Sequence, residues 1–190
     1  MKLKIFHIAF VLYFILSACH DNNKGLRIEN TDPELMLQNG VLYYKETPFS
    51  GFVVSYFVNK KIQSEIEYVK GRKHGYEKQW YQNDSLSLTR LYTKGFKTGI
   101  HKAWWENGNK KFEYHFDNKG QYHGNVKEWY TTGQVYRDFN YKNGKESGSQ
   151  RLWKKNGNIK ANYEVINGER FGLIGLKKCY RIQDKSNSIN

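Results

Sequence analysis

Five aromatic residues recur along the chain at a nearly fixed spacing, and four of them follow a basic residue by two positions. The aromatic column is Tyr56, Trp80, Trp104, Trp129 and Trp153. The residues two positions earlier are Val54, Lys78, Lys102, Lys127 and Arg151. Aromatic and arginine side chains supply much of the energy of protein interfaces, so these residues could bind a partner. The alternative is that the aromatics only pack neighbouring repeats together while the lysines keep one surface solvated.

Catalytic chemistry is not indicated. The sequence has no nucleophile elbow, no His-Glu-x-x-His, no phosphate loop and no dinucleotide fingerprint. His74 and His123 occupy the same repeat position, but two repeats separate them, roughly 20 Å, which is too far for one metal ion. The carboxylates stand beside basic residues, which favours surface pairing; examples are Glu77, Glu106, Glu128 and Asp138. We expect no catalytic residue, no metal and no cofactor.

The first 19 residues have the layout of a secretory signal. Lys2 and Lys4 precede an apolar run over 5–16, and Leu16-Ser17-Ala18-Cys19 follows. These last four residues resemble the bacterial lipoprotein signal, which implies that Cys19 is lipidated and becomes the first mature residue. An ordinary secretory peptide and an uncleaved anchor helix are the alternatives.

The predicted segments therefore start with a signal peptide over 1–18 and a lipidated Cys19 with a polar tether over 19–38. Cleavage removes two lysines and no acid, which lowers the formal charge from +13 to +11. Cys179 then has no partner for an intramolecular disulfide, and we interpret it as a small buried residue.

Composition limits the remaining chain to one domain with an aromatic core. The 190 residues have a mean hydropathy of -0.83, yet 15 Tyr, 11 Phe and 5 Trp can bury large areas. That aromatic content argues against disorder. The single long apolar run excludes a polytopic membrane protein, and two cysteines exclude a disulfide framework.

From residue 51 onward the chain repeats with a period of about 24 residues, which is typical of repeat proteins. The repeated glycines are Gly51, Gly75, Gly99, Gly124, Gly148 and Gly172, and the last five each have a further glycine four residues earlier. A second aromatic column follows the first by one residue: Phe57, Tyr81, Trp105 and Tyr130, with Lys154 breaking the rule. The period decides the fold, because each unit must pack against the next.

Each unit has the pattern of two short strands. Turn-forming pairs such as Asn107-Gly108 follow the aromatic columns. Further on, apolar residues flank a polar one, as in Tyr114-His115-Phe116, and this period of two predicts a half-buried strand. One unit has an extra residue near Asp117-Asn118-Lys119, where we expect a turn.

These columns resemble the MORN repeat, and more closely its bacterial variant form, in which Gly-x-x-x-Gly, a Trp-Tyr pair and Asn-Gly recur. Five units over 51–172 match, and 39–51 resembles a leading half unit. The resemblance implies an all-β fold, an elongated antiparallel meander of tandem two-stranded repeats. We assign 39–182 to the MORN-variant array, with its last units decaying as a cap, and 183–190 to a C-terminal tail. Some members of the variant family are described as antitoxin partners, and many others are lipoproteins.

In such a sheet, the tryptophan and lysine columns share one face and the second aromatic column borders the other. One face must supply the core, and the sequence leaves open which. The candidate binding surface is Trp80, Trp104, Trp129, Trp153, Lys78, Lys102, Lys127 and Arg151.

The expected function is that of a lipid-anchored, non-enzymatic protein of the cell envelope, in the outer membrane and facing the periplasm or the surface. Its repeats would serve as a protein-binding scaffold, and neutralising a toxin is a more specific form of that role. The alternatives are a carbohydrate or cell-wall binding module that uses the aromatic ladder, and adhesion to an anionic polymer or lipid. Export argues against a nucleic-acid partner despite the pI of 9.6.

Overall fold

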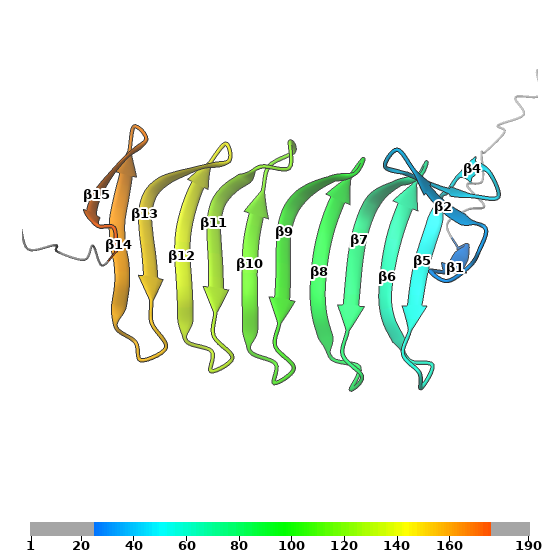
Figure 1. Cartoon of the computed structure of the whole chain (residues 1–190), viewed down its shortest axis with the longest axis horizontal. Coiled ribbons are helices and arrows are strands. Elements are labelled where there is room, and N and C mark those ends of the chain that lie inside the picture. The colour runs from blue at the N-terminus through cyan, green and yellow to red at the C-terminus, as the bar shows by residue number, and fades with distance from the viewer. Residues whose placement is uncertain (1–24, 176–190) are drawn as a thin grey trace, which may run out of the picture.

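The computed structural model describes residues 25–175, so Cys19 with the predicted signal peptide, and Cys179 with the predicted tail, lie outside the described part. Within 25–175 the chain forms 15 strands, and no helix there is long and apolar enough to cross a membrane. Twelve strands form one sheet in the order β1-β5-β6-β7-β8-β9-β10-β11-β12-β13-β14-β15 (Figure 1). The predicted elongated antiparallel meander is confirmed.

The strands of the main sheet are β1 (Arg27–Glu29), β5 (Gly51–Tyr56), β6 (Ile62–Val69), β7 (Arg72–Trp80), β8 (Leu86–Thr93), β9 (Phe96–Trp104), β10 (Lys110–Phe116), β11 (Tyr122–Trp129), β12 (Val135–Lys142), β13 (Lys145–Trp153), β14 (Ile159–Ile166) and β15 (Glu169–Leu173). A smaller sheet contains β2 (Leu35–Gln38), β3 (Val41–Tyr44) and β4 (Thr47–Pro48). All neighbours pair antiparallel except β1, which pairs parallel with β5.

The turns along the upper edge in Figure 1 are mostly tight hairpins. Lys70 and Gly71, between β6 and β7, have φ of 50° and 73°, as a two-residue I′ turn requires. The same pair of positive φ values recurs at Lys94-Gly95, Asn143-Gly144 and Asn167-Gly168. The link from β10 to β11 is longer and contains 117–121, so the extra residue lies in a turn, as predicted.

The turns along the lower edge begin with the second aromatic column. Trp105 N–H donates to the carbonyl of Asn109, and Gly108 N–H donates to the carbonyl of Trp105 (2.8 and 2.9 Å). The same two bonds close the other four lower turns. In the first two repeats Lys60 and Asp84 hold φ of 63° and 64° where later repeats have glycine, so all five turns share one shape.

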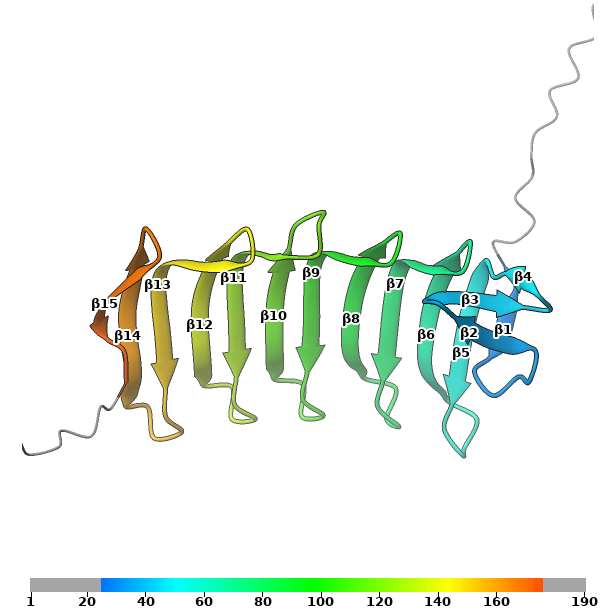
Figure 2. The same cartoon turned by 45° about the horizontal axis from the view of Figure 1, so that its top comes forward.

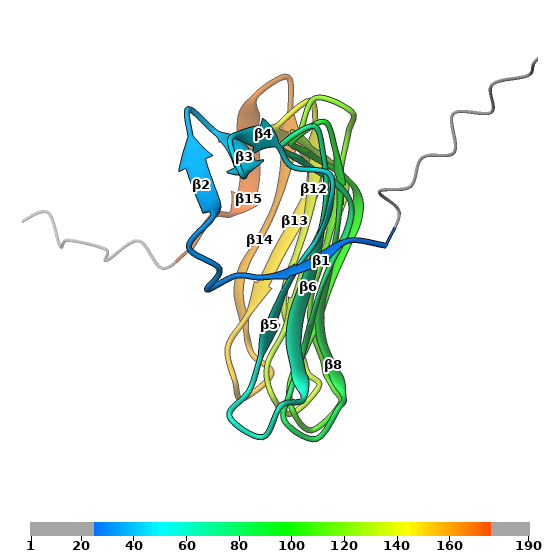
Figure 3. The same ribbon diagram turned by 90° about the vertical axis from the view of Figure 1, so that its right-hand side faces the viewer.

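One face of the main sheet carries most of the buried residues. Strand alternation places one equivalent residue of each repeat at its centre, and each of these is at most 9% exposed: Val53, Glu77, His101, Val126 and Gln150. We call this side the inner face and the opposite side the outer face. Seen along the array, the strands are bowed, and β2 to β4 lie on the inner side of the bow (Figure 3). Rings of Tyr92, Phe139 and Tyr163 cover the rest of the inner face and are themselves buried.

The N-terminal end differs from the prediction. Ile28 in β1 is buried against Phe49 and Val53, so the ordered sheet starts inside the segment 19–38 that the sequence assigns to a tether. The half unit at 39–51 does not extend the main sheet: β3 and β4 join β2 and lie across the inner face near β5 (Figure 2). The predicted tether extends too far because most residues of 20–30 are polar. The apolar Ile28 among them packs against the sheet.

Candidate functional site

Strand alternation places the eight residues predicted to form a binding surface on the outer face, and one of them, Trp129, also lines the inner-face cleft described below, where its carbonyl accepts a hydrogen bond from Trp105. The pairing of neighbouring strands places the four basic members in one line that runs across the sheet. In this line each residue is paired with the next: Glu65, Lys78, Thr89, Lys102, Glu113, Lys127, Asp138, Arg151 and Asn162. Lys127 pairs with Asp138 at 3.1 Å, and Lys102 lies 3.7 Å from Glu113. The line alternates in charge from Lys102 to Arg151, so this part of it is not a basic stripe, whereas only the neutral Thr89 separates Lys78 from Lys102.

The tryptophans of the first column stand at the lower ends of their strands. All four are half-buried, and the ammonium of Lys110 lies 5.3 Å from the ring centroid of Trp129. Trp153 lies beside Asp138 and Arg151 of the same face. The outer face thus combines half-buried indoles with a neutralised charge line.

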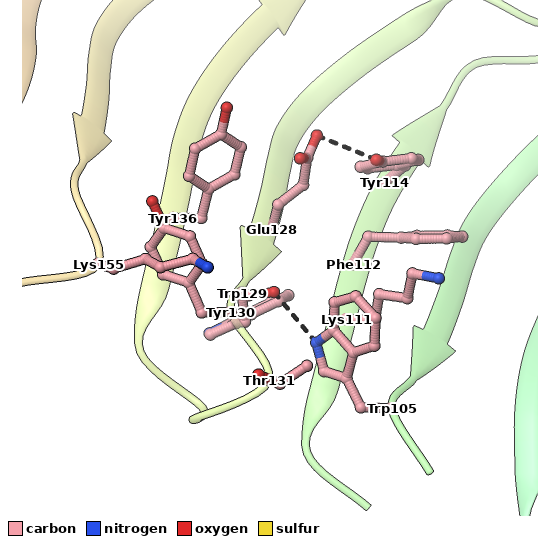
Figure 4. A pocket seen from close by; sticks show the side chains of 10 residues that line it. All are labelled: Trp105, Lys111, Phe112, Tyr114, Glu128, Trp129, Tyr130, Thr131, Tyr136 and Lys155. Carbon is pink, nitrogen blue, oxygen red and sulfur yellow. Dashed lines mark hydrogen bonds between the residues drawn. The ribbon is translucent and has the colours of Figure 1, made fainter.

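The inner face contains an aromatic cleft of about 360 Å³ between the third and fourth repeats (Figure 4). We define the aromatic cleft by its lining residues: Trp105, Lys111, Phe112, Tyr114, Glu128, Trp129, Tyr130, Thr131, Tyr136 and Lys155. Two of them, Lys111 and Tyr136, are the extra residues where β10 and β12 shift register against their neighbours. Such bulges commonly redirect a side chain, and here they bring both into the cleft.

Hydrogen bonds between repeats hold the walls of the cleft. Trp105 Nε1 donates to the carbonyl of Trp129 at 3.2 Å, and the Tyr130 hydroxyl donates to the carbonyl of Trp153 at 3.0 Å (Figure 4 shows the first). Tyr81 makes the same bond to Trp104 at 2.9 Å. Three members of the second aromatic column therefore tie their lower turns to the next repeat. A cleft built this way is formed before any ligand arrives.

The polar floor of the cleft is a hydrogen-bonded network in which the buried Nε of Arg137 has no partner among the described residues. The Tyr114 hydroxyl donates to Glu128 at 3.0 Å, and Arg137 donates to the same carboxylate at 3.1 Å and to the Tyr141 oxygen at 2.7 Å. Burial and, next, the charge of Glu128 raise the pKa of Tyr114 far above its usual range. Tyr114 therefore stays a neutral hydrogen-bond donor, and Glu128 is already engaged.

A second buried network surrounds Glu77. Its carboxylate, in a residue 3% exposed, accepts from Lys73 at 2.9 Å, Gln79 at 3.0 Å and Arg90 at 3.3 Å. Burial by itself would raise the pKa of Glu77, but Lys73 and then Arg90 outweigh burial and hold it below the usual range. Burial first, and then Glu77, raise the pKa of Tyr92 to about 12. The network is saturated and structural.

His101 is the only histidine buried among the described residues. Nε2 lies 2.9 Å from the carbonyl of Leu91, and the ring packs between Tyr92 and Phe116 at centroid distances of 5.6 and 4.5 Å. Burial lowers the pKa of His101, so it packs as a neutral ring that donates to Leu91. Among residues 25–175, no three His, Cys, Asp or Glu side chains are placed to share a metal ion.

The predicted binding surface overlaps the aromatic cleft only at Trp129, and the other lining residues lie outside the first aromatic column and were not predicted. The available signal was in the second column, where Trp105 is the only tryptophan. Tyr114 belongs to the predicted apolar alternation, whereas Phe112 and Tyr136 were not singled out by any predicted column.

A scan of the chain against known protein families found no match. A search of curated proteins found none either.

Proposed function

We propose that this chain is a non-enzymatic binding protein that recognises another protein through the aromatic cleft. The observation that carries the proposal is the preformed cleft of about 360 Å³ between the third and fourth repeats, whose rings are fixed by hydrogen bonds between repeats. Buried aromatic pockets are typical anchoring points of protein interfaces, and rigid walls reduce the entropy lost on binding. Lys111 and Lys155 at the rim add a basic border.

The polar groups of the inner face support binding over catalysis. Glu128 and Glu77 are the carboxylates of its two networks, and each is held by cations at hydrogen-bond distance. A general acid needs a raised pKa, whereas that of Glu77 is lowered. Glu77 therefore lacks the raised pKa of a general acid, and Glu128 accepts hydrogen bonds from Tyr114 and Arg137.

The ring arrangement favours a protein ligand over a sugar. Lys111 lies over the ring of Trp105 at 4.5 Å, and Phe112 stacks on Tyr114 with centroids 4.3 Å apart and planes 11° apart. These contacts already cover one face of each ring. A partner side chain can fill the gap between ring edges, whereas a sugar ring needs an open aromatic face.

The test is cross-linking and capture with the tagged full-length chain in the source organism. We expect Trp105→Ala/Tyr136→Ala to lose the partner recovered with the wild type, because both side chains line the cleft. Tyr56→Ala/Tyr76→Ala is the matched control, with two aromatics 40% and 52% exposed outside the cleft. Equal loss in both variants, or salt-resistant binding to purified cell-wall glycans without any protein partner, would contradict the proposal.

We also propose that the array belongs to the MORN-variant family and that lipid at Cys19 holds it in the cell envelope. Both statements rest on the sequence, through the repeated columns and the Leu16-Ser17-Ala18-Cys19 signal. Metabolic labelling with a fatty-acid analogue should mark the wild type and not Cys19→Ala. Label on the alanine variant, or no label on the wild type, would rule out lipidation of Cys19. Toxin neutralisation is a more specific form of the proposed protein binding, and the identity of the captured partner would test it.

A further inference from the structure

A second cleft opens at the upper edge of the sheet, between the β6–β7 and β8–β9 turns. It measures about 650 Å³, and we call it the basic cleft: its lining residues are Val69, Lys70, Arg72, His74, Lys94 and Phe96. Lys70, Arg72 and Lys94 take part in no ion pair within the part of the chain that the structure describes. This differs from the outer charge line, where most cations face a carboxylate.

Carboxylates are missing from the walls of the basic cleft. The nearest one in sequence on β6 is Glu67, which lies against Gly75: a Cβ added to that glycine would overlap its carboxylate. Glu67 does not line the cleft. Three exposed cations therefore line one open volume, and no carboxylate lines it with them.

Apolar surface lies among these cations. Phe96 is 58% exposed and Val69 is 41% exposed, although both belong to an ordered hairpin edge. Exposed aromatic and aliphatic groups beside unpaired cations are typical of surfaces that bind a partner. A simple inorganic anion would use the cations and leave Phe96 and Val69 in water.

The walls of the basic cleft are fixed relative to one another. Gly95 N–H in the β8–β9 turn donates to the carbonyl of Lys73 on β7 at 2.8 Å. Lys94 N–H donates to Nδ1 of His74 at 3.4 Å. Hydrogen bonds thus join the β8–β9 turn to β7, and both line the basic cleft.

We propose that the basic cleft binds an extended acidic peptide segment that carries an aromatic or branched aliphatic side chain between its carboxylates. Lys70, Arg72 and Lys94 pair with the carboxylates, and Val69 and Phe96 cover the apolar side chain. A concave cleft admits a chain, whereas a flat lipid surface would meet only its rim. This site is separate from the aromatic cleft, so its binding does not depend on the proposed function.

Fluorescence anisotropy with labelled synthetic peptides tests the proposal on the full chain. The probe is a short peptide with one Phe flanked by two Asp and two Glu; the comparison peptides replace Phe by Ser, or the acids by their amides. We expect binding to the first peptide, weakened by raising NaCl from about 50 to about 300 mM. Each comparison peptide should bind roughly tenfold more weakly, since each lacks one half of the contact.

The decisive variant is Arg72→Gln/Lys94→Gln, which should raise the dissociation constant roughly tenfold. The matched control is Lys142→Gln/Lys145→Gln, which removes the same charge from another upper turn and should leave the constant within about twofold. Circular dichroism melting of both variants checks that they fold. Equal weakening by the two variants would overturn the proposal, since only net charge would then matter. Failure of the Phe peptide while vesicles with about one third phosphatidylglycerol bind would overturn it in favour of a membrane surface.

Discussion

The two faces of the sheet use charge in different ways. On the inner face Glu77 is 3% exposed and lies within 3.3 Å of both Lys73 and Arg90. On the outer face Lys127 and Asp138 pair at 3.1 Å, but their side chains keep 31% and 25% of their exposure. The ion-pair distances on the two faces are similar, but the inner pairs are buried and the outer pair is exposed to solvent. Solvent screens the outer pair, so the inner network should carry far more stability.

Truncating one ring on each face should give the largest contrast. Phe139 is 9% exposed on the inner face, and Phe139→Ala should lower the free energy of unfolding by about 3–5 kcal/mol through the cavity it leaves. Tyr76→Ala, at a residue 52% exposed, should cost less than about 1 kcal/mol. Urea denaturation measures both. Similar losses would mean that the inner face is not the core.

Substitutions in the ionic networks of the two faces should differ less in their effect on stability than the two ring truncations. Glu77→Gln should cost about 2 kcal/mol, because Lys73 and Arg90 lose their buried charged acceptor. Asp138→Asn on the outer face should cost less than about 1 kcal/mol, and salt should reduce that further. Urea denaturation at low and high salt separates the two. A larger loss from Asp138→Asn would reverse the comparison.

The pH dependence of stability should follow the same network. The folded-state pKa of Glu77 lies below its usual range, so its ionised form stabilises the fold above the unfolded-state pKa. That contribution is lost as pH falls through the lowered folded-state pKa. Melting temperatures across the acidic range should therefore fall more steeply for the wild type than for Glu77→Gln. Parallel curves would show that Glu77 does not carry the effect.

The hydrogen bonds between lower turns should have the smallest measurable effect. Tyr81→Phe removes the bond to the Trp104 carbonyl, and Tyr130→Phe removes the bond to the Trp153 carbonyl, each at about 1 kcal/mol. Tyr76→Phe should be nearly neutral, because its hydroxyl belongs to an exposed residue of the outer face. If all three substitutions change the free energy of unfolding by nearly zero in urea denaturation, these hydrogen bonds do not stabilise the contact between neighbouring repeats.

Much of the fold follows from the sequence because turns and strands have local signals. Paired glycines and Asn-Gly predict turns, and alternation around residues such as Tyr114 predicts strands. The central inner residues could not be identified in this way: Glu77, His101 and Gln150 are polar and yet buried, because partners on the same or the adjacent strand satisfy them. The hydropathy of a residue depends on its side-chain type alone and does not show whether a hydrogen-bond partner allows it to be buried.

The candidate site was harder to predict than the fold. The first aromatic column is the stronger pattern, but it lies on the outer face beside a charge line that pairing neutralises. The aromatic cleft depends on Lys111 and Tyr136, which enter it through register shifts between strands. The same shift recurs at the equivalent position of every repeat, so the sequence period does not single out these two side chains. Strand β1 was also not predicted. It belongs to the main sheet because Ile28 pairs with Val53 of β5, and such pairing between distant segments cannot be seen in a local sequence pattern.

Site-specific photocross-linking on the two faces tests the central claim most directly. A benzophenone amino acid replaces Tyr136 in the aromatic cleft or Tyr76 on the outer face, in the full-length chain inside the source organism. A binding role for the inner face predicts a discrete cross-linked protein from position 136 and none from position 76. A discrete adduct from position 76 alone would contradict the claim and move recognition to the outer face.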